Sequence, residues 1–472
     1  MRNAGRLLTM LAATAACSTS HSSSSTSGDG SGGDGSGMDG GMGDGSGGGM
    51  GSGHGSGSGS GSGSDEPGAA VCSRDQHGIM LPEGFCATVF ADRVGKPRHI
   101  AVTPSGHVFV AVAPTSDTSN DGHVLSLFDA DHDGVAELQQ AFGSVGGNGI
   151  DWKDGALYVA ADDRIVRFTV PDGYALPAEP DPVTIVGGLP TTGDHTAKTI
   201  VLVNDELYVN FGSASNACQV ANREPHSAGK DPCDELPERA GIWEFEAGMT
   251  DQTMPCGERV AAGMRNTNAL ALDAVAGTLW GAINGRDQLH DNWPEHYTAD
   301  QDTRLPSDEV VAITDDLDRG WPYCYHDAVA GQMKLAPEYG GDGTMQGRCA
   351  AIPSPEIALP AHSAPLGMVF VTGSQFPPEF RSGALVSNHG SRFDAEAAAA
   401  DLHGYDVEFI GFEHGMPTGR VVPFATGFDA GMRPLPDAAP HRPVGLAMMP
   451  DGSLLIGDDK GGRIWRVSYP AR

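Results

Sequence analysis

One unit of sequence recurs six times within residues 67–472, and this repetition constrains the fold more than any other feature. Each unit begins with a stretch of alternating apolar residues, continues through a polar turn, and ends in a second stretch that often contains Leu-Tyr-Val or a variant of it. The units occupy 99–112, 149–161, 199–211, 269–283, 367–388 and 445–458. Alternation with a period of two, interrupted by turn residues, predicts antiparallel β-strands.

A third alternating stretch follows each unit, at 122–128, 163–168, 240–245, 308–313, 404–409 and 462–467. Six such groups, with no convincing long helix between them, predict an all-β chain folded as a six-bladed β-propeller of four-stranded antiparallel blades. A β-sandwich or two separate β domains are the alternatives. Long loops at one mouth of the central channel would form the functional surface, and the longest insertions are 213–239 and 320–365.

The residues before these repeats have a different composition. Residues 18–66 consist mostly of glycine and serine and contain no aromatic residue. Such a segment cannot bury enough apolar surface to offset the entropy that ordering would cost. We therefore expect a disordered linker over 18–66, followed by the propeller domain over 67–472.

A leader of the secretory type precedes this linker. Residues 1–17 combine Arg2 and Arg6, a short apolar run, and the ending Ala15-Ala16-Cys17. This ending resembles a bacterial lipobox, in which the cysteine carries a lipid, although Thr14 stands where the motif usually has leucine. The pattern predicts export and a lipid anchor at the outer membrane, facing the periplasm or the cell surface. A soluble periplasmic or secreted protein is the alternative.

An excess of acidic residues excludes several classes of partner. The chain has 29 Lys and Arg against 61 Asp and Glu, which gives a formal net charge of −32. Nucleic-acid phosphates require a positive surface, so we expect no nucleic-acid partner. No apolar run is long enough for a multi-span membrane protein, and any membrane contact would be made through the lipid anchor.

Seven cysteines follow Cys17, and none forms the Cys-x-x-Cys pair that is typical of metal binding. In an oxidising compartment disulfides are the natural interpretation. Proximity in sequence suggests the pairs Cys72–Cys86, Cys218–Cys233 and Cys324–Cys349. One thiol is then left over, and Cys256 is the candidate.

Several phrases of the repeat region resemble, in order, the glucose/sorbosone dehydrogenase family. They are Leu81-Pro-Glu-Gly-Phe85, Gly263-Met-Arg-Asn266, Asn284-Gly-Arg-Asp287, Gly320-Trp-Pro-Tyr-Cys324, His362-Ser-Ala-Pro-Leu-Gly-Met368, His389-Gly-Ser391 and Arg442-Pro-Val-Gly-Leu446. The resemblance runs from about Leu81 to Tyr469. It implies a soluble quinoprotein on a six-bladed propeller, which oxidises an alcohol or aldehyde group of a sugar with the cofactor pyrroloquinoline quinone (PQQ) and calcium.

The resemblance also implies roles for individual residues. His195 matches the family's catalytic base, and an imidazole that titrates near neutral pH suits the removal of an alcohol proton. Arginine side chains present a fork of donors that suits the carboxylates of the cofactor. The cofactor-binding candidates are Arg265, Asn266, Arg442, Arg392 and Lys198.

The stretch from Asn284 to Asp287 matches the segment around the family's calcium. The resemblance implies the main-chain carbonyls of Gly285 and Arg286 as ligands, with Asn284 and Asp287 as further contributors. Calcium accepts carbonyl oxygens, so no cluster of carboxylates is required.

A second acidic stretch, with Asp129, Asp131 and Asp133 before Gly134, has the opening spacing of a calcium loop. The twelfth position is Gln140 in place of glutamate, and no flanking helix is expected. We therefore expect a solvated hairpin turn there, with calcium as the alternative.

Departures from the family pattern leave the substrate open. Gly146-Gly-Asn148-Gly149, Thr267, Arg392-Phe393 and Pro440 stand where relatives often carry other residues. Electrons would pass to a separate acceptor such as a periplasmic cytochrome, because the chain has no Cys-x-x-Cys-His haem motif. The alternatives are a non-catalytic propeller that binds carbohydrate or protein, and a calcium-dependent lactonase, which would need several carboxylates or asparagines around one metal in the channel.

Overall fold

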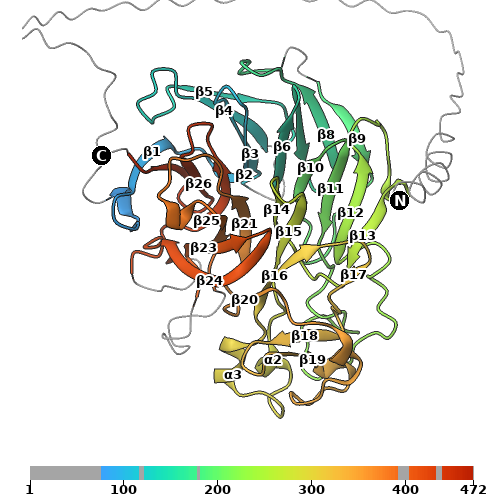
Figure 1. The fold of residues 1–472 in the computed structure, drawn as a ribbon. Coiled ribbons are helices and arrows are strands. Elements are labelled where there is room, and N and C mark those ends of the chain that lie inside the picture. Colours follow the sequence, from blue (N-terminus) through green and yellow to red (C-terminus); the bar gives the residue numbers. More distant parts are fainter. Residues whose placement is uncertain (1–75, 116–121, 178–180, 392–402, 432–437, 471–472) are drawn as a thin grey trace, which may run out of the picture. The chain divides into compact units, whose positions relative to one another are not determined.

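The structure is a computed structural model that describes residues 76–115, 122–177, 181–391, 403–431 and 438–470. Within these ranges the chain forms a β-propeller of six antiparallel sheets, as Figure 1 shows. The predicted fold class is therefore confirmed. The predicted leader (1–17) and linker (18–66) lie outside the described residues.

The first three blades follow the chain in order. Blade 1 contains β2 (Lys96–Val102), β3 (Val108–Ala113), β4 (His123–Phe128) and β5 (Leu138–Phe142). Blade 2 contains β6 (Gly149–Lys153), β7 (Ala156–Ala160), β8 (Arg164–Thr169) and β9 (Val183–Gly187). Blade 3 contains β10 (Ile200–Val203), β11 (Glu206–Phe211), β12 (Gly241–Glu246) and β13 (Glu258–Ala262), with the short β17 (Leu317–Asp318) added in parallel to β13.

The last three blades include the long insertions. Blade 4 contains β14 (Ala269–Asp273), β15 (Thr278–Ile283), β16 (Asp308–Ile313) and β20 (Ile357–Leu359). Blade 5 contains β21 (Pro365–Phe370), β22 (Gly383–Asn388), β23 (Asp406–Glu413) and β24 (Met416–Ala425). Blade 6 contains β25 (Pro443–Met448), β26 (Leu454–Asp458), β27 (Arg463–Ser468) and β1 (Cys86–Asp92).

The sixth blade joins the two ends of the described chain. Its outer strand β1 pairs antiparallel with β27, from Cys86 opposite Ser468 to Asp92 opposite Arg463. These main-chain hydrogen bonds tie the two ends of the described chain together and close the ring. The repeat pattern does not show this closure, because β1 precedes the first repeat.

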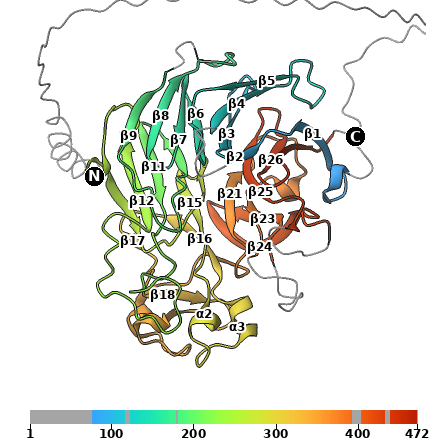
Figure 2. The same cartoon turned by 180° about the vertical axis from the view of Figure 1, so that it is seen from behind.

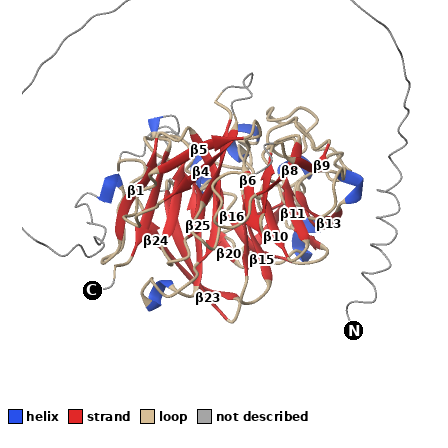
Figure 3. Cartoon of the chain, turned by 90° about the horizontal axis from the view of Figure 1, so that it is seen from above, coloured by secondary structure: helices blue, strands red, loops and turns tan. Residues whose placement is uncertain are grey.

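A small subdomain projects from blade 4, as both Figure 1 and Figure 2 show. It contains α2 (Leu289–Asn292), α3 (Ala299–Arg304) and the hairpin of β18 (Cys324–Asp327) and β19 (Gln332–Leu335). The remaining short elements are the 3₁₀ turns η1 (Gln76–Gly78), η2 (Met254–Cys256), η3 (Pro337–Tyr339), η4 (Gly347–Ala351) and η5 (Pro378–Phe380). Figure 3 shows how far strands outnumber these short helices, and none of the described helices is long and apolar enough to span a membrane.

The inner strands approach one another closely around the channel. A Cβ atom on Gly445 would lie 2.2 Å from the carbonyl oxygen of Arg98, and one on Gly367 would lie 2.1 Å from that of Val444. These two glycines therefore allow neighbouring blades to meet backbone to backbone. Farther from the axis, apolar side chains fill the space between blades, for example Trp280 and Phe412, whose ring centroids are 5.0 Å apart.

Two of the predicted disulfides are confirmed. Cys218 bonds to Cys233 and Cys324 bonds to Cys349. Cys86 and Cys256 are also disulfide-bonded. The prediction of a free thiol at Cys256 is therefore wrong, because spacing along the chain does not determine which cysteines the fold brings together. The predicted partner of Cys86, Cys72, lies outside the described residues.

Candidate active site

The predicted site residues lie on loops at one mouth of the channel. In an antiparallel blade, the loop before the inner strand and the loop after the second strand lie at the same end. His195, Arg265 and Arg442 precede β10, β14 and β25, while 284–287 follows β15. The fold therefore brings these segments to one face, which we call the site mouth.

His195 is partly buried, and its ring is held on one side. Its Nδ1 lies 3.0 Å from both the carbonyl oxygen and the hydroxyl oxygen of Ser213. Gly212 allows this approach, because a Cβ there would lie 2.5 Å from the Cβ of His195. Burial, followed by the positive charge of Arg265, lowers the pKa of His195 to about 3. The imidazole is therefore neutral at physiological pH, as a general base must be.

Arg265 and Asp287 form an ion pair beside this histidine. The Arg265 guanidinium lies 3.1 Å from Asp287 Oδ2, and the same carboxylate is 3.3 Å from Arg223 and 3.5 Å from His362 Nδ1. Asn216 orients both partners, because its Oδ1 accepts hydrogen bonds from Arg265 Nη2 and from the Asp287 N–H. Burial lowers the pKa of Arg265, while the Asp287 charge opposes this shift.

Asn266 is one of the residues at this mouth whose side chain is not fully hydrogen-bonded. Its side-chain oxygen is buried and has no hydrogen-bond partner among the described residues. A Cβ on Gly212 would lie 2.9 Å from this oxygen, which places it next to His195. An unpaired buried acceptor costs about 1–3 kcal/mol, so this oxygen indicates a place where a ligand N–H or O–H can donate.

The predicted calcium segment is firmly anchored. Asn284 donates to the carbonyl of Pro365 at 3.0 Å, and Gly285 N–H donates to Asp308 at 2.7 Å. Burial raises the pKa of Asp308 to about 6. The Arg286 guanidinium is paired with the buried Glu338 of the blade 4 subdomain. The roles of Gly285, Arg286, Asn284 and Asp287 as metal ligands stay predictions.

A second charged cluster lies across the same mouth, between blades 6, 1 and 5. Asp459 pairs with Arg98 and lies 2.8 Å from His389 Nε2. Arg442 donates to the carbonyls of His389 at 2.9 Å and Gly390 at 3.1 Å. Hydrogen bonds from His389 and nearby positive charges lower the pKa of Asp459 despite its burial. Arg442 is therefore held at the site mouth, but on the side opposite to the Arg265–Asp287 pair.

Lys198 and Arg392 are the remaining cofactor-binding candidates. The Lys198 ammonium is buried and donates to the carbonyl of Pro190 at 2.7 Å and to that of Thr196. Burial lowers its pKa to about 8. Lys198 therefore makes its hydrogen bonds within the loop that carries His195, and its ammonium is not part of the Arg265–Asp287 ion pair. Arg392 lies outside the described residues.

Three polar residues at the site mouth, Asp162, Asp459 and Ser213, were not singled out by the motifs, whereas His389 was matched as part of His389-Gly-Ser391. Asp162, His389 and Asp459 stand directly after the second strand of their blades or one residue beyond it, as Asn284 does after β15. The rule that this position faces the site mouth would have found them. Ser213 follows β11 in the same way, but its role depends on contact with another loop.

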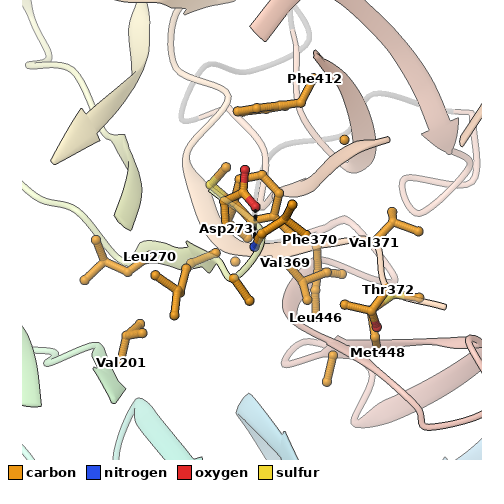
Figure 4. Close-up of a pocket in the computed structure, with 18 of the residues that line it drawn as sticks. Val201, Leu270, Asp273, Val369, Phe370, Val371, Thr372, Phe412, Leu446 and Met448 are labelled. Atoms are coloured by element: carbon orange, nitrogen blue, oxygen red, sulfur yellow. Dashed lines mark hydrogen bonds between the residues drawn. The ribbon is translucent and has the colours of Figure 1, made fainter. Parts of the chain in front are cut away.

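Two cavities open along the channel. One of about 400 Å³ lies at the site mouth, beside the His195 loop, and is lined by residues that include Arg98, Asp162, Thr196 and Asp459. The larger, of about 630 Å³, lies toward the opposite end of the channel. Apolar side chains such as Leu270, Val369 and Leu446 line it together with polar groups such as Asp273, as Figure 4 shows.

The acidic stretch at blade 1 forms a compact turn. The ligand-type oxygens of Asp129, Asp131, Asp133 and Glu137 lie within 4.8 Å of one another. Asp129 pairs with Arg466 at 2.6 Å and accepts a hydrogen bond from Gly134 N–H at 3.0 Å. This arginine already compensates the charge of the most buried carboxylate.

Fold and site together define a six-bladed propeller with a partly buried histidine and paired arginines at one channel mouth. A model of the TrAA12-like family matches residues 79–470, and the chain belongs to this family. The recognition predicted from the motifs is thereby confirmed.

Solved structures share the fold at low identity. A family AA12 carbohydrate-active enzyme of Trichoderma reesei is 18% identical, with a TM-score of 0.66, over 83% of this chain and 98% of that chain. The PQQ domain of pyranose dehydrogenase from Coprinopsis cinerea, in its holo form, is 18% identical with a TM-score of 0.65, over 83% and 97% of the two chains. An uncharacterized protein of Borreliella burgdorferi is 25% identical over 406 residues, which are 83% of this chain and 91% of its own.

Proposed function

We propose that this protein is a PQQ-dependent oxidoreductase that oxidises an alcohol or aldehyde group of a sugar. The observation that carries the proposal is the arrangement at the site mouth, where a partly buried neutral histidine lies beside Arg265 and the unpaired oxygen of Asn266. Related folds support it, since the Coprinopsis cinerea domain is a PQQ domain of pyranose dehydrogenase and the Escherichia coli neighbour, with a TM-score of 0.51, is a soluble aldose sugar dehydrogenase.

The residues present fit such a cofactor. PQQ carries three carboxylates and an N–H, and the mouth offers the guanidinium groups of Arg265 and Arg442 together with the unpaired acceptor of Asn266. When bound, PQQ supplies the carbon that accepts the hydride of the substrate. The carbonyls of Gly285 and Arg286 would hold the calcium that polarises the quinone oxygen.

His195 performs the proton transfer in this proposal. Its Nδ1 is engaged by Ser213, so Nε2 is the atom that takes the hydroxyl proton of the substrate. A pKa lowered to about 3 keeps the ring deprotonated, and the negative charge that develops during the reaction would raise its affinity for the proton. Arg265 stabilises negative charge at the same place.

The alternative activities have less support. A lactonase would need several carboxylates or asparagines around one metal in the channel. Among the described residues, the two groups of three or more His, Cys, Asp and Glu side chains that could hold a metal lie at the blade 1 turn and at the Cys218–Cys233 disulfide, not in the channel. A non-catalytic propeller would have no need for a buried unpaired acceptor beside a neutral histidine.

The location and the acceptor are also proposals. We infer export and anchoring through Cys17, with a periplasmic cytochrome or small molecule as acceptor, and the two intrachain disulfides are consistent with an oxidising compartment. Replacing Cys17 by alanine should move the protein from the membrane fraction to the soluble fraction. Retention in the membrane fraction would remove the lipid anchor from the proposal.

Reconstitution tests the enzyme proposal directly. The purified protein is mixed with calcium and PQQ, and the reduction of a redox dye is followed with a panel of aldoses. We expect quinone absorbance to remain with the protein after gel filtration, and dye reduction to depend on both sugar and PQQ. A folded sample that neither retains PQQ nor reduces the dye would refute the proposal, and lactone hydrolysis without PQQ would favour the lactonase.

A further inference from the structure

We propose that Ser213 is a positioning residue that holds His195 in one tautomer, with the proton on Nδ1 and the lone pair on Nε2. The inference deepens the proposed function, on which it rests, because only this tautomer leaves Nε2 free to take a proton from the substrate. It assigns a role to a serine that no motif indicated.

Counting hydrogens establishes the tautomer. The Ser213 hydroxyl lies 2.6 Å from the carbonyl oxygen of Ser215, an atom that only accepts, so the hydroxyl hydrogen is used there. The same hydroxyl oxygen, 3.0 Å from His195 Nδ1, must therefore accept. The second neighbour of Nδ1 is the Ser213 carbonyl oxygen, also at 3.0 Å and also an acceptor. Two acceptors around one ring nitrogen require that this nitrogen carries the hydrogen.

The turn that presents these acceptors is rigid. Ser213 is fully buried, and its N–H donates to the Arg265 carbonyl at 2.7 Å. Glu235 binds the next two residues, since its carboxylate accepts from Ala214 N–H at 2.7 Å, from Ser215 N–H at 3.2 Å and from the Ser215 hydroxyl. The Cys218–Cys233 disulfide closes the same insertion. The orientation of His195 is thus fixed by an insertion of blade 3.

The charged groups around His195 do not take over this role. Asp194, its neighbour in the loop, pairs with Arg223 at 2.9 Å, and Asp287 pairs with Arg265 at 3.1 Å. His195 Nδ1 has hydrogen-bond contacts only with Ser213 among the described residues. Neutral acceptors fix the tautomer without placing a carboxylate against the ring, so they orient the base and leave its affinity for protons low.

Nitrogen NMR of the full chain tests the tautomer without PQQ. The protein is labelled with ¹⁵N-histidine, and the His195 signals are assigned by their loss in a His195→Gln variant. At pH 7 we expect Nδ1 to have the shift of a protonated nitrogen and Nε2 that of an unprotonated one. The opposite pattern, or two tautomers in equal amounts, would overturn the proposal. This result is independent of turnover, so it stands apart from any failure of the proposed function.

Kinetics on the PQQ-loaded protein tests whether the hydroxyl of Ser213 supports the catalytic rate by orienting His195. Ser213→Ala removes one of the two acceptors, so we expect kcat to fall about tenfold with little change in KM or in PQQ retention, as the loss of one hydrogen bond predicts. Ser213→Thr keeps the hydroxyl and should recover most of the lost rate. Ser227→Ala, in the same insertion but with its hydroxyl bonded to Ala221 N–H at 2.9 Å, is the matched control and should leave kcat unchanged. Wild-type kcat in Ser213→Ala would contradict the role of Ser213.

Discussion

The two ends of the channel are built from the same six inner strands but differ in chemistry. At the site mouth, ion pairs such as Arg265–Asp287 and Arg98–Asp459 surround a partly buried histidine. Toward the other end, apolar side chains such as Val369 and Leu446 line the larger cavity (Figure 4). The strands provide stability along their whole length, whereas the loops at one end provide the polar groups. This division explains how a propeller can vary its chemistry without changing its core.

Replacing His195 at the site mouth should lower kcat far more than replacing a histidine at the opposite end of the channel. We expect His195→Gln to lower kcat by about 10²–10⁴-fold, the usual contribution of a general base, while PQQ is still retained. His414→Gln, whose side chain is exposed and lies at the opposite end, should leave kcat unchanged. Steady-state dye reduction measures kcat for both variants. Equal losses of kcat would contradict the placement of the reaction at the site mouth.

Truncating a core residue in the wall of the larger cavity should lower the free energy of unfolding and leave the catalytic rate unchanged. Leu446 is 7% exposed, and Leu446→Ala should lower the free energy of unfolding by about 2–4 kcal/mol through the cavity it leaves. The rate per folded molecule should stay close to that of the wild type. Denaturant unfolding and active-site titration separate these quantities, and a stable but inactive variant would show that this end of the channel takes part in the reaction.

Removing a cation from the site mouth should weaken the cofactor complex. Arg265→Met is expected to raise the Kd of PQQ by roughly 10–100-fold, since a charge-assisted pair is lost while Asp287 keeps Arg223 and His362 as partners. Arg381→Met, at the rim of the larger cavity, is the matched control. Fluorescence titration with PQQ gives both constants, and a similar Kd for the two variants would place the cofactor elsewhere.

Acid should destabilise the channel through its buried histidines. Burial lowers the pKa of His99 to about 4 in the folded protein, below the ordinary value of 6.5, so the unfolded chain binds this proton more readily. The stabilisation is therefore complete above pH 6.5 and is lost as the pH falls toward 4, by about 1–3 kcal/mol. His99→Gln, which can still donate to Leu366, should flatten the fall in melting temperature over this range. An unchanged slope would contradict the assignment.

The strand pattern of the sequence predicted most of the fold. The predicted stretch 308–313 coincides with β16, and 122–128 differs from β4 by one residue. These strands follow from period-two alternation between turns, which is a local property of the chain. His195, Arg265 and Arg442 each precede the inner strand of a blade. These positions along the sequence fix the end of the channel at which the three residues lie.

Contacts between distant segments could not be predicted in the same way. Arg98 and Asp459 are separated by 361 residues, and only closure of the ring brings them together. Cys256 was left over by spacing alone, yet it is disulfide-bonded.

By itself, the sequence determined six blades, the mouth that carries the polar loops, and two of the disulfides, because each depends on short-range patterns. Only the tertiary structure decided that β1 completes the sixth blade, that Asp287 pairs with Arg265, and that Ser213 fixes the ring of His195. These outcomes depend on the paths of loops and on which donors and acceptors become buried together, and burial is a property of the folded whole.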